Sequence, residues 1–197
     1  MLEKVLQKKN LSKRAILTVK GAVTLGVIAL AVGLPQLVHL AAGATGGAKW
    51  LPMYLPVLIG GCLLGVWWGL GIGIAAPTVS FLVTAAAGNP MPVAARLPYM
   101  IVELAVFGAI GGLFSKSINK NVWMAFPATL FAIVGGRCVF MAVAAIFQSV
   151  SPLSGATAWQ QVQTGLLAVV LQAVIVPAVV IGLKLLLDRD KKEKTEE

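Results

Sequence analysis

Charged residues are scarce in this chain. Only 12% of its 197 residues are Asp, Glu, Lys or Arg, whereas 58% are hydrophobic and the mean hydropathy is +0.90. A water-soluble domain carries about 25% charged residues. Apolar runs recur to the end of the chain, so one removable signal segment does not explain them. The composition predicts an all-α integral membrane protein.

Residue types that perform catalysis are also rare. The chain has one histidine, His39, and two cysteines, Cys62 and Cys138, each alone inside an apolar run. Isolated buried cysteines are typical of packing rather than of a disulfide or metal site. The HExxH and GxSxG motifs are absent, and "GGLFSKS" (111–117) lacks the spacing of a phosphate-binding loop. We expect no enzymatic activity, cofactor or metal.

Acidic residues are fewer than basic ones, 7 against 16, which gives a net charge of +9. The basic residues cluster at positions 4–20 and 184–194, beside apolar runs and without interleaved aromatics. Nucleic-acid binding is therefore not expected. Clusters of this kind mark the cytoplasmic edges of membrane spans, where lipid is the neighbour.

Six spans of about 20 residues are predicted. They are roughly Ala15–Leu34, Leu55–Val66 (with a possible extension to Gly69), Trp68–Ala86, Pro98–Phe114, Val122–Phe147 and Gln161–Leu187. The second and third nearly abut, and merging them would give five spans with the termini on opposite sides. The charges favour six spans and two cytoplasmic termini, because the outer connections (35–54, 87–97 and 148–160) carry only Lys49 and Arg96. Residues 1–187 then form one six-helix membrane domain, followed by a charged cytoplasmic tail, 188–197.

Three spans each bring a polar residue to the outer half of the membrane. Glu103, Arg137 and Gln172 lie about 8, 15 and 16 Å below the outer edge at 1.5 Å per residue. A charge in hydrocarbon costs roughly 2.5–3.5 kcal/mol on insertion scales and marks a functional site by default. One interpretation is a ligand cavity that contains all three residues. The other is a Glu103–Arg137 ion pair that only locks two helices together.

The remaining candidate ligand contacts surround these residues. Tyr99 shares a helix face with Glu103, and Gln161 starts a polar stripe that continues to Gln172. The long outer connections are rich in Gly, Pro, Ser and aromatic residues, as binding loops often are, although plain connectors are the alternative. They and their borders add further candidates: Trp50, Tyr54, Asn89, Arg96 and Trp159.

An ordered set of short segments resembles one membrane protein family. The segments are "LPMYLPVLIGGCLLG", "APTVSFLVT", "GNPMP", "LPYMIVELAVFGAIGGL" and "GGR". Across roughly residues 15–187 they resemble the substrate-binding S components of energy-coupling factor (ECF) transporters. The resemblance implies a prokaryotic plasma-membrane protein that captures a vitamin or similar micronutrient from outside. It also implies partners: a membrane T component and two cytosolic ATPases that power uptake.

The family pattern is not matched everywhere. Tyr54 stands where the family has histidine, and Phe107 stands where it has an aromatic hydroxyl, so the resemblance does not identify the substrate. The family's first helix docks on the T component through an Ala-x-x-x-Ala pattern, and the nearest match here is Ala22-x-x-x-Gly26. Small residues four apart permit close helix contact in lipid.

Other functions remain open at this point. A self-sufficient secondary transporter or channel would need a continuous polar path, but the inner halves of the spans contain few polar side chains. An intramembrane enzyme would need a nucleophile and base that the sequence does not offer. A purely structural subunit would leave the polar residues unexplained.

Overall fold

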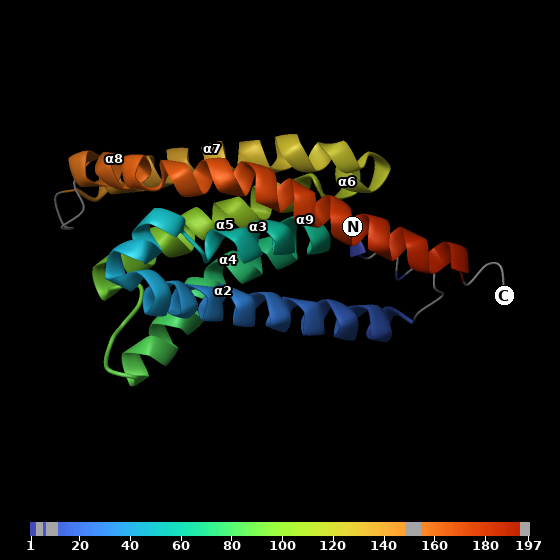
Figure 1. Ribbon diagram of the computed structural model, residues 1–197, viewed down its shortest axis with the longest axis horizontal. Coiled ribbons are helices and arrows are strands. Elements are labelled where there is room, and N and C mark those ends of the chain that lie inside the picture. Colours follow the sequence, from blue (N-terminus) through green and yellow to red (C-terminus); the bar gives the residue numbers. More distant parts are fainter. Residues whose placement is uncertain (3–5, 7–11, 149–154, 194–197) are drawn as a thin grey trace.

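The computed structural model describes residues 1–2, 6, 12–148 and 155–193, and every regular element in these residues is helical (Figure 1). The all-α prediction is therefore confirmed for the described chain. The helices are α2 (Lys13–Trp50), α3 (Tyr54–Leu64), α4 (Val66–Ala86), α5 (Leu97–Leu113), α6 (Ser115–Lys120), α7 (Ala125–Ile146), α8 (Gly155–Thr164) and α9 (Leu166–Glu193). Two 3₁₀ turns, η1 (Ala94–Arg96) and η2 (Val122–Met124), precede α5 and α7.

Five helical segments are long and apolar enough to cross a membrane. They are Lys13–Gly43, Val66–Ala86, Ala94–Lys120, Val122–Ile146 and Leu166–Leu187. A sixth apolar helix, α3, has only 11 residues. Its rise of about 16 Å is roughly half of the ~30 Å hydrocarbon core of a bilayer. The chain is a multi-pass membrane protein in which one of the predicted spans is a half-length helix.

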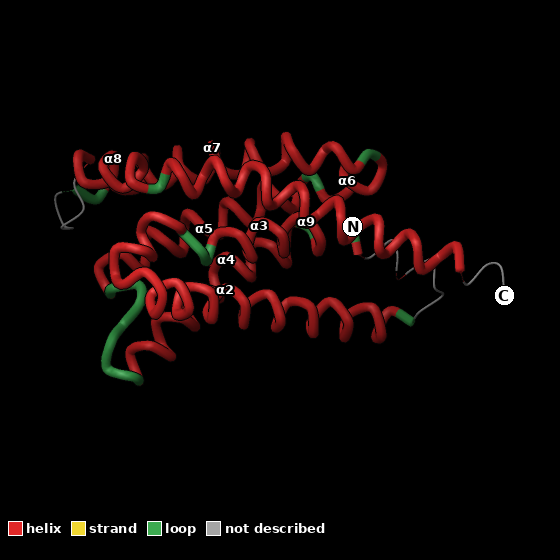
Figure 2. Tube along the Cα trace, viewed as in Figure 1, coloured by secondary structure: helices red, strands yellow, loops and turns green. Residues whose placement is uncertain are grey.

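The helices lie side by side along the long axis of the molecule. Figure 1 shows α2 along one side, α7 with α8 and α9 along the other, and α3 and α5 between them, whereas α4 crosses α2 obliquely and its green end emerges beyond α2. The start of α2 and the end of α9 lie at the same end of the bundle, and α8 lies at the opposite end. Among the described residues, the longest loop joins α4 to α5 at the α8 end (Figure 2).

The second and third predicted spans are two separate helices. They meet at Gly65, whose φ of 96° lies in the left-handed region that favours glycine. Gly61 and Gly69, four residues to either side, lie next to each other, so the chain folds back on itself at Gly65. The two predicted spans are therefore not merged into one continuous helix.

Two expected outer connections are largely helical. The first predicted span does not end near Leu34, because the helix continues through Pro35 to Gly43, where a kink with non-helical backbone (φ 67°) separates it from a second helical stretch that ends at Trp50. Proline is tolerated inside membrane helices when neighbouring groups compensate for the lost backbone bond. In the last connection, α8 begins at Gly155, and a break at Gly165 separates it from α9.

Glycine contacts set the spacing of the central helices. A Cβ atom on Gly108 of α5 would lie under 3.0 Å from backbone atoms of Gly69 on α4, and Gly73 and Gly112 are equally confined. Along α4 and its start, positions 65, 69 and 73 recur every fourth residue: the Gly65–Val66 backbone meets Gly112, Gly69 meets Gly108, and Gly73 meets the backbone of Leu104. In lipid, close backbone packing replaces the hydrophobic effect as the force that holds helices together. These glycines therefore fix α5 against α4.

Lys184 links α9 to α6 at the end of the bundle beyond which α9 extends. Its Nζ donates hydrogen bonds to the backbone oxygens of Asn119 (2.7 Å) and Ile118 (3.2 Å), in the last turn of α6. A cation at a helix C-terminus is favoured because the final carbonyls lack intrahelical partners. Lys184, which sequence analysis places in a basic cytoplasmic cluster, is thus a buried structural contact.

Candidate ligand-binding site

A cavity of about 820 Å³ opens at the α8 end of the bundle. Its wall is assembled from helix ends and connections rather than from one segment. The lining residues are Pro35 and His39 of α2, Leu51–Tyr54, Ser80 of α4, Asn89–Val93, Ala95, Arg96, Met100 and Glu103 before and in α5, Arg137 and Phe140 of α7, and Thr157, Gln160, Gln161 and Thr164 of α8. The volume lies in the range of small-molecule pockets, about 300–1,000 Å³.

Three polar side chains from three helices meet in the wall. Glu103 of α5 accepts a hydrogen bond from the Tyr54 hydroxyl of α3 at Oε2 (2.6 Å). Its other oxygen, Oε1, lies 2.9 Å from Nη1 of Arg137 on α7. The Arg137 guanidinium also lies over the Tyr54 ring, 5.3 Å from its centroid. Each residue of this trio therefore contacts both others.

Packing behind the trio holds it in place. Phe107, one turn after Glu103 on α5, meets the Tyr54 ring edge to face at a centroid distance of 5.2 Å. Gly136, next to Arg137, lies so close to the Phe107 ring that any Cβ would clash with it. The glycine lets α7 approach α5 closely enough for the ion pair to form. Phe107 does not line the cavity, whereas Tyr54 does.

The trio leaves hydrogen-bonding capacity unused. Glu103 is 1% exposed and the Arg137 side chain 12%. Arg137 Nε and Nη2 are buried and have no hydrogen-bond partner among the described residues. A buried donor without a partner costs about 1–3 kcal/mol or more. This arrangement fits a site in which a ligand completes the hydrogen bonding.

The connection between α4 and α5 is fastened to α4 by two hydroxyls. The backbone nitrogen of Met91 donates to Thr84 Oγ1 (2.7 Å), and Ser80 Oγ donates to the Met91 carbonyl (2.8 Å). Both hydroxyl residues lie on one face of α4, four positions apart. These bonds hold Asn89 and the prolines that follow it against the cavity.

Six of the ten predicted ligand contacts line the cavity: Tyr54, Asn89, Arg96, Glu103, Arg137 and Gln161. Gln172 does not line it. Its Nε2 donates instead to the backbone oxygen of Leu51 (3.1 Å). Gln172 therefore supports the segment before α3 and does not face the ligand cavity. Tyr99 also lies away from the cavity, buried against Phe140 and Ala158.

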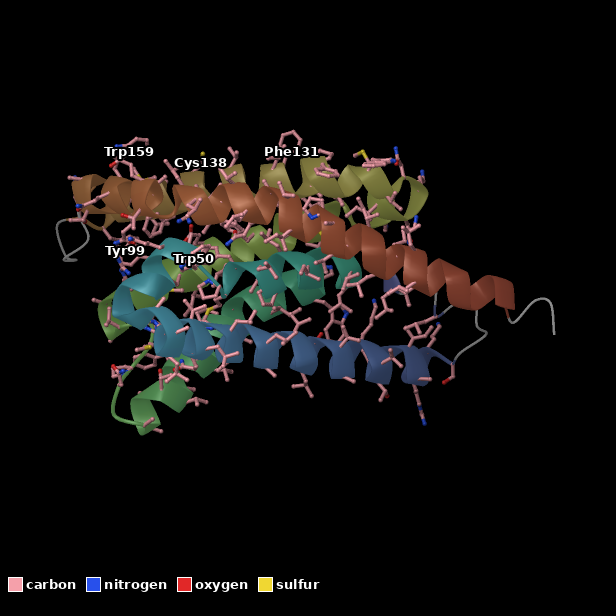
Figure 3. The ribbon with its side chains drawn as sticks, in the orientation of Figure 1. Trp50, Tyr99, Phe131, Cys138 and Trp159 are labelled. Atoms are coloured by element: carbon pink, nitrogen blue, oxygen red, sulfur yellow. The ribbon has the colours of Figure 1, made fainter. Side chains whose placement is uncertain are left out.

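The two tryptophans among the candidate ligand contacts are on the surface. Trp50 is 45% exposed and Trp159 is 54% exposed. Figure 3 shows Trp159 on the outer face of α8, pointing away from the bundle. Indole rings prefer the membrane–water interface, where one edge is apolar and the other is hydrated. Their position at the end of the bundle fits this preference, and neither residue lines the cavity.

Several lining residues were not predicted as ligand contacts. His39, which falls in the predicted outer connection 35–54, lies on α2 because that helix continues past Pro35. Ser80 and Gln160 line the cavity as well. The recurrence of hydroxyls at positions 80 and 84 of an apolar helix is the sequence signal that could have identified Ser80.

The two predicted docking residues lie outside the cavity. Ala22 and Gly26 are exposed on α2, and a Cβ on Gly26 would meet nothing within 4 Å. Among the described residues no cluster of three metal-ligating side chains occurs.

Models of known protein families, curated proteins and solved structures give no match to this chain. The family resemblance stated above therefore rests on its sequence segments alone.

Proposed function

We propose that this protein is the substrate-capture (S) subunit of an ECF-type importer. It binds a vitamin or similar micronutrient from outside a prokaryotic plasma membrane, with both of its termini in the cytoplasm. A T component and two cytosolic ATPases supply the energy for uptake. The observation that carries the proposal is the cavity at one end of a membrane bundle, lined by the Glu103–Arg137 pair with unused donors on Arg137.

The packing below the cavity supports capture rather than free passage. Nine of the 11 residues of α3 are buried. This helix starts at the cavity and contacts α2, α4, α5, α7 and α9. Most of its side chains are apolar, so the central axis offers no polar route through the bundle. A secondary transporter or channel, the alternative function, needs such a route.

The exposed small residues of α2 support a partner surface. Ala22 and Gly26 lie on the face of α2 that points away from the bundle, where no other described residue covers them. Small residues four apart allow another helix to pack closely in lipid. We assign this face to the T component.

Ligand retention tests the proposal. The wild-type chain is purified in mild detergent, and the small molecules released on denaturation are identified by mass spectrometry. The same procedure on the Glu103→Gln/Arg137→Met variant is the control. We expect one molecule to be retained by the wild type alone. If neither retention nor a screen of water-soluble vitamins yields a ligand, capture is refuted.

Transport by the isolated chain separates the two functions. Proteoliposomes that contain only this protein should bind the retained molecule and fail to accumulate it, with or without an ion gradient. Accumulation driven by a gradient would establish the secondary transporter instead.

A further inference from the structure

The charges around the cavity do not balance. Arg96 and Arg137 both line it, and Glu103 is the one carboxylate in its wall. Arg96 is half-buried and has no ion-pair or hydrogen-bond partner among the described residues. The local excess of one positive charge needs an anion, because an uncompensated guanidinium away from bulk water is destabilising.

Within the part of the chain that the structure describes, no acidic residue other than Glu103 lines the cavity. The remaining ones are Glu3, Asp188, Asp190, Glu193, Glu196 and Glu197. Asp188, Asp190 and Glu193 belong to the part of α9 that leaves the opposite end of the bundle (Figure 1), and Glu3, Glu196 and Glu197 lie outside the described residues. The segment 149–154, near the cavity end in sequence, reads SVSPLS and contains no carboxylate.

The carboxylate of Glu103 is already engaged. Tyr54 donates to one oxygen, and Arg137 forms an ion pair with the other, so the negative charge of Glu103 is already compensated within the protein. In contrast, Nε and Nη2 of Arg137 are free to donate. A carboxylate accepts paired hydrogen bonds from a guanidinium, and bonds of this charge-assisted kind are the strong ones.

The rest of the wall is mainly apolar. Leu51, Met53, Met91, Met100 and Phe140 contribute side chains without charge. A small inorganic anion would leave most of the roughly 820 Å³ unfilled and these side chains without a partner. We therefore infer that the ligand is a small organic monocarboxylate whose acidic group pairs with Arg137 and Arg96 and whose largely apolar body occupies the remainder. This inference rests on the capture function proposed above.

Matched pairs of probes test the charge of the ligand. Thermal stability and binding of the purified wild-type chain are measured with small carboxylates and with their neutral amides or alcohols, such as nicotinate with nicotinamide and pantothenate with pantothenol. The molecules retained through purification are methyl-esterified before a second mass measurement. We expect that the acid of at least one pair binds and that its neutral partner does not. Alternatively, a retained molecule should gain one methyl group on esterification, which indicates one carboxyl group.

Two single substitutions locate the charge effect. Arg96→Gln should weaken binding of that carboxylate by about tenfold or more, the worth of one charge-assisted hydrogen bond. Lys49→Gln is the matched control, because Lys49 is exposed near the same end and does not line the cavity. It should leave the affinity unchanged.

The outcomes distinguish the monocarboxylate inference from the capture function on which it rests. A retained or bound molecule without an acidic group, or a neutral probe that binds as tightly as its acid, refutes the monocarboxylate and leaves capture standing. Equal losses from Arg96→Gln and Lys49→Gln also refute it, since they indicate general attraction to a positive surface. Failure of every probe together with an empty extract refutes both proposals.

Discussion

Replacing Glu103 and Arg137 singly and together distinguishes a ligand site from a helix lock. The variants are Glu103→Gln, Arg137→Met and the double substitution. Breaking a buried ion pair by removing one partner costs about 3–5 kcal/mol, because the other charge stays behind. Arg137→Met leaves a carboxylate that is 1% exposed, and Glu103→Gln leaves a guanidinium that is 12% exposed and borders the cavity. Arg137→Met should therefore be the more damaging single change.

The double variant removes both charges and should recover most of the stability. We expect the cycle to give a coupling free energy of about 2 kcal/mol or more. A loss of 3–5 kcal/mol corresponds to about 6–20 °C in the unfolding midpoint of a domain of this size. Thermal unfolding in detergent, followed by intrinsic fluorescence, measures these shifts on the same samples that are used for ligand binding.

Affinity then decides between the two interpretations. If the pair is part of the ligand site, the double variant is folded and no longer binds, because the ligand has lost its charged contacts. If the pair only locks α5 to α7, the double variant keeps the wild-type affinity. That second result would remove Glu103 and Arg137 from the site and with them the proposed reason for their burial.

Three further predictions concern topology, partner docking and packing. Reporter fusions at Gly46 and Glu197 should report opposite compartments if, as proposed, both termini are cytoplasmic; a shared compartment would overturn the span count. Gly26→Leu should impair energised uptake in cells while the purified chain keeps its ligand affinity, and loss of that affinity would contradict a docking role. Gly108→Leu should lower the free energy of unfolding by about 3 kcal/mol through its clash with α4. Gly71→Leu, whose Cβ meets nothing within 4 Å, is the matched control, and an equal loss in both would refute the packing argument.

The composition and the polar residues of the spans predicted much of the site. The 3.6-residue repeat and the rise per residue placed Glu103 and Arg137 at depths that a long arginine side chain can bridge, and the two residues do form a pair. Tyr54 was listed among the aromatic candidates without a partner. Its hydrogen bond to Glu103 depends on where α3 crosses α5. Closely packed glycines set this crossing, and a hydropathy pattern does not reveal which glycines pack against each other.

The errors have a common physical origin. Pro35, Gly43 and the glycines at 46 and 47 favour a loop by local propensity. The helix nevertheless continues through Pro35 and, after a kink at Gly43, helical turns resume and extend to Trp50. Tertiary packing and the need to satisfy backbone groups near a membrane override such preferences. The same extension moved His39 from a presumed loop to the cavity wall and carried Trp50 to the surface.

The short central helix has an electrical consequence. Below the cavity, the axis of the bundle is filled over about 16 Å by α3, whose core residues Val57, Leu58 and Cys62 are fully buried. Ions cannot follow a path in which neither water nor polar side chains replace their hydration shell. A bilayer that contains this protein alone should therefore show the conductance of bare lipid, whether the cavity above α3 is filled or empty.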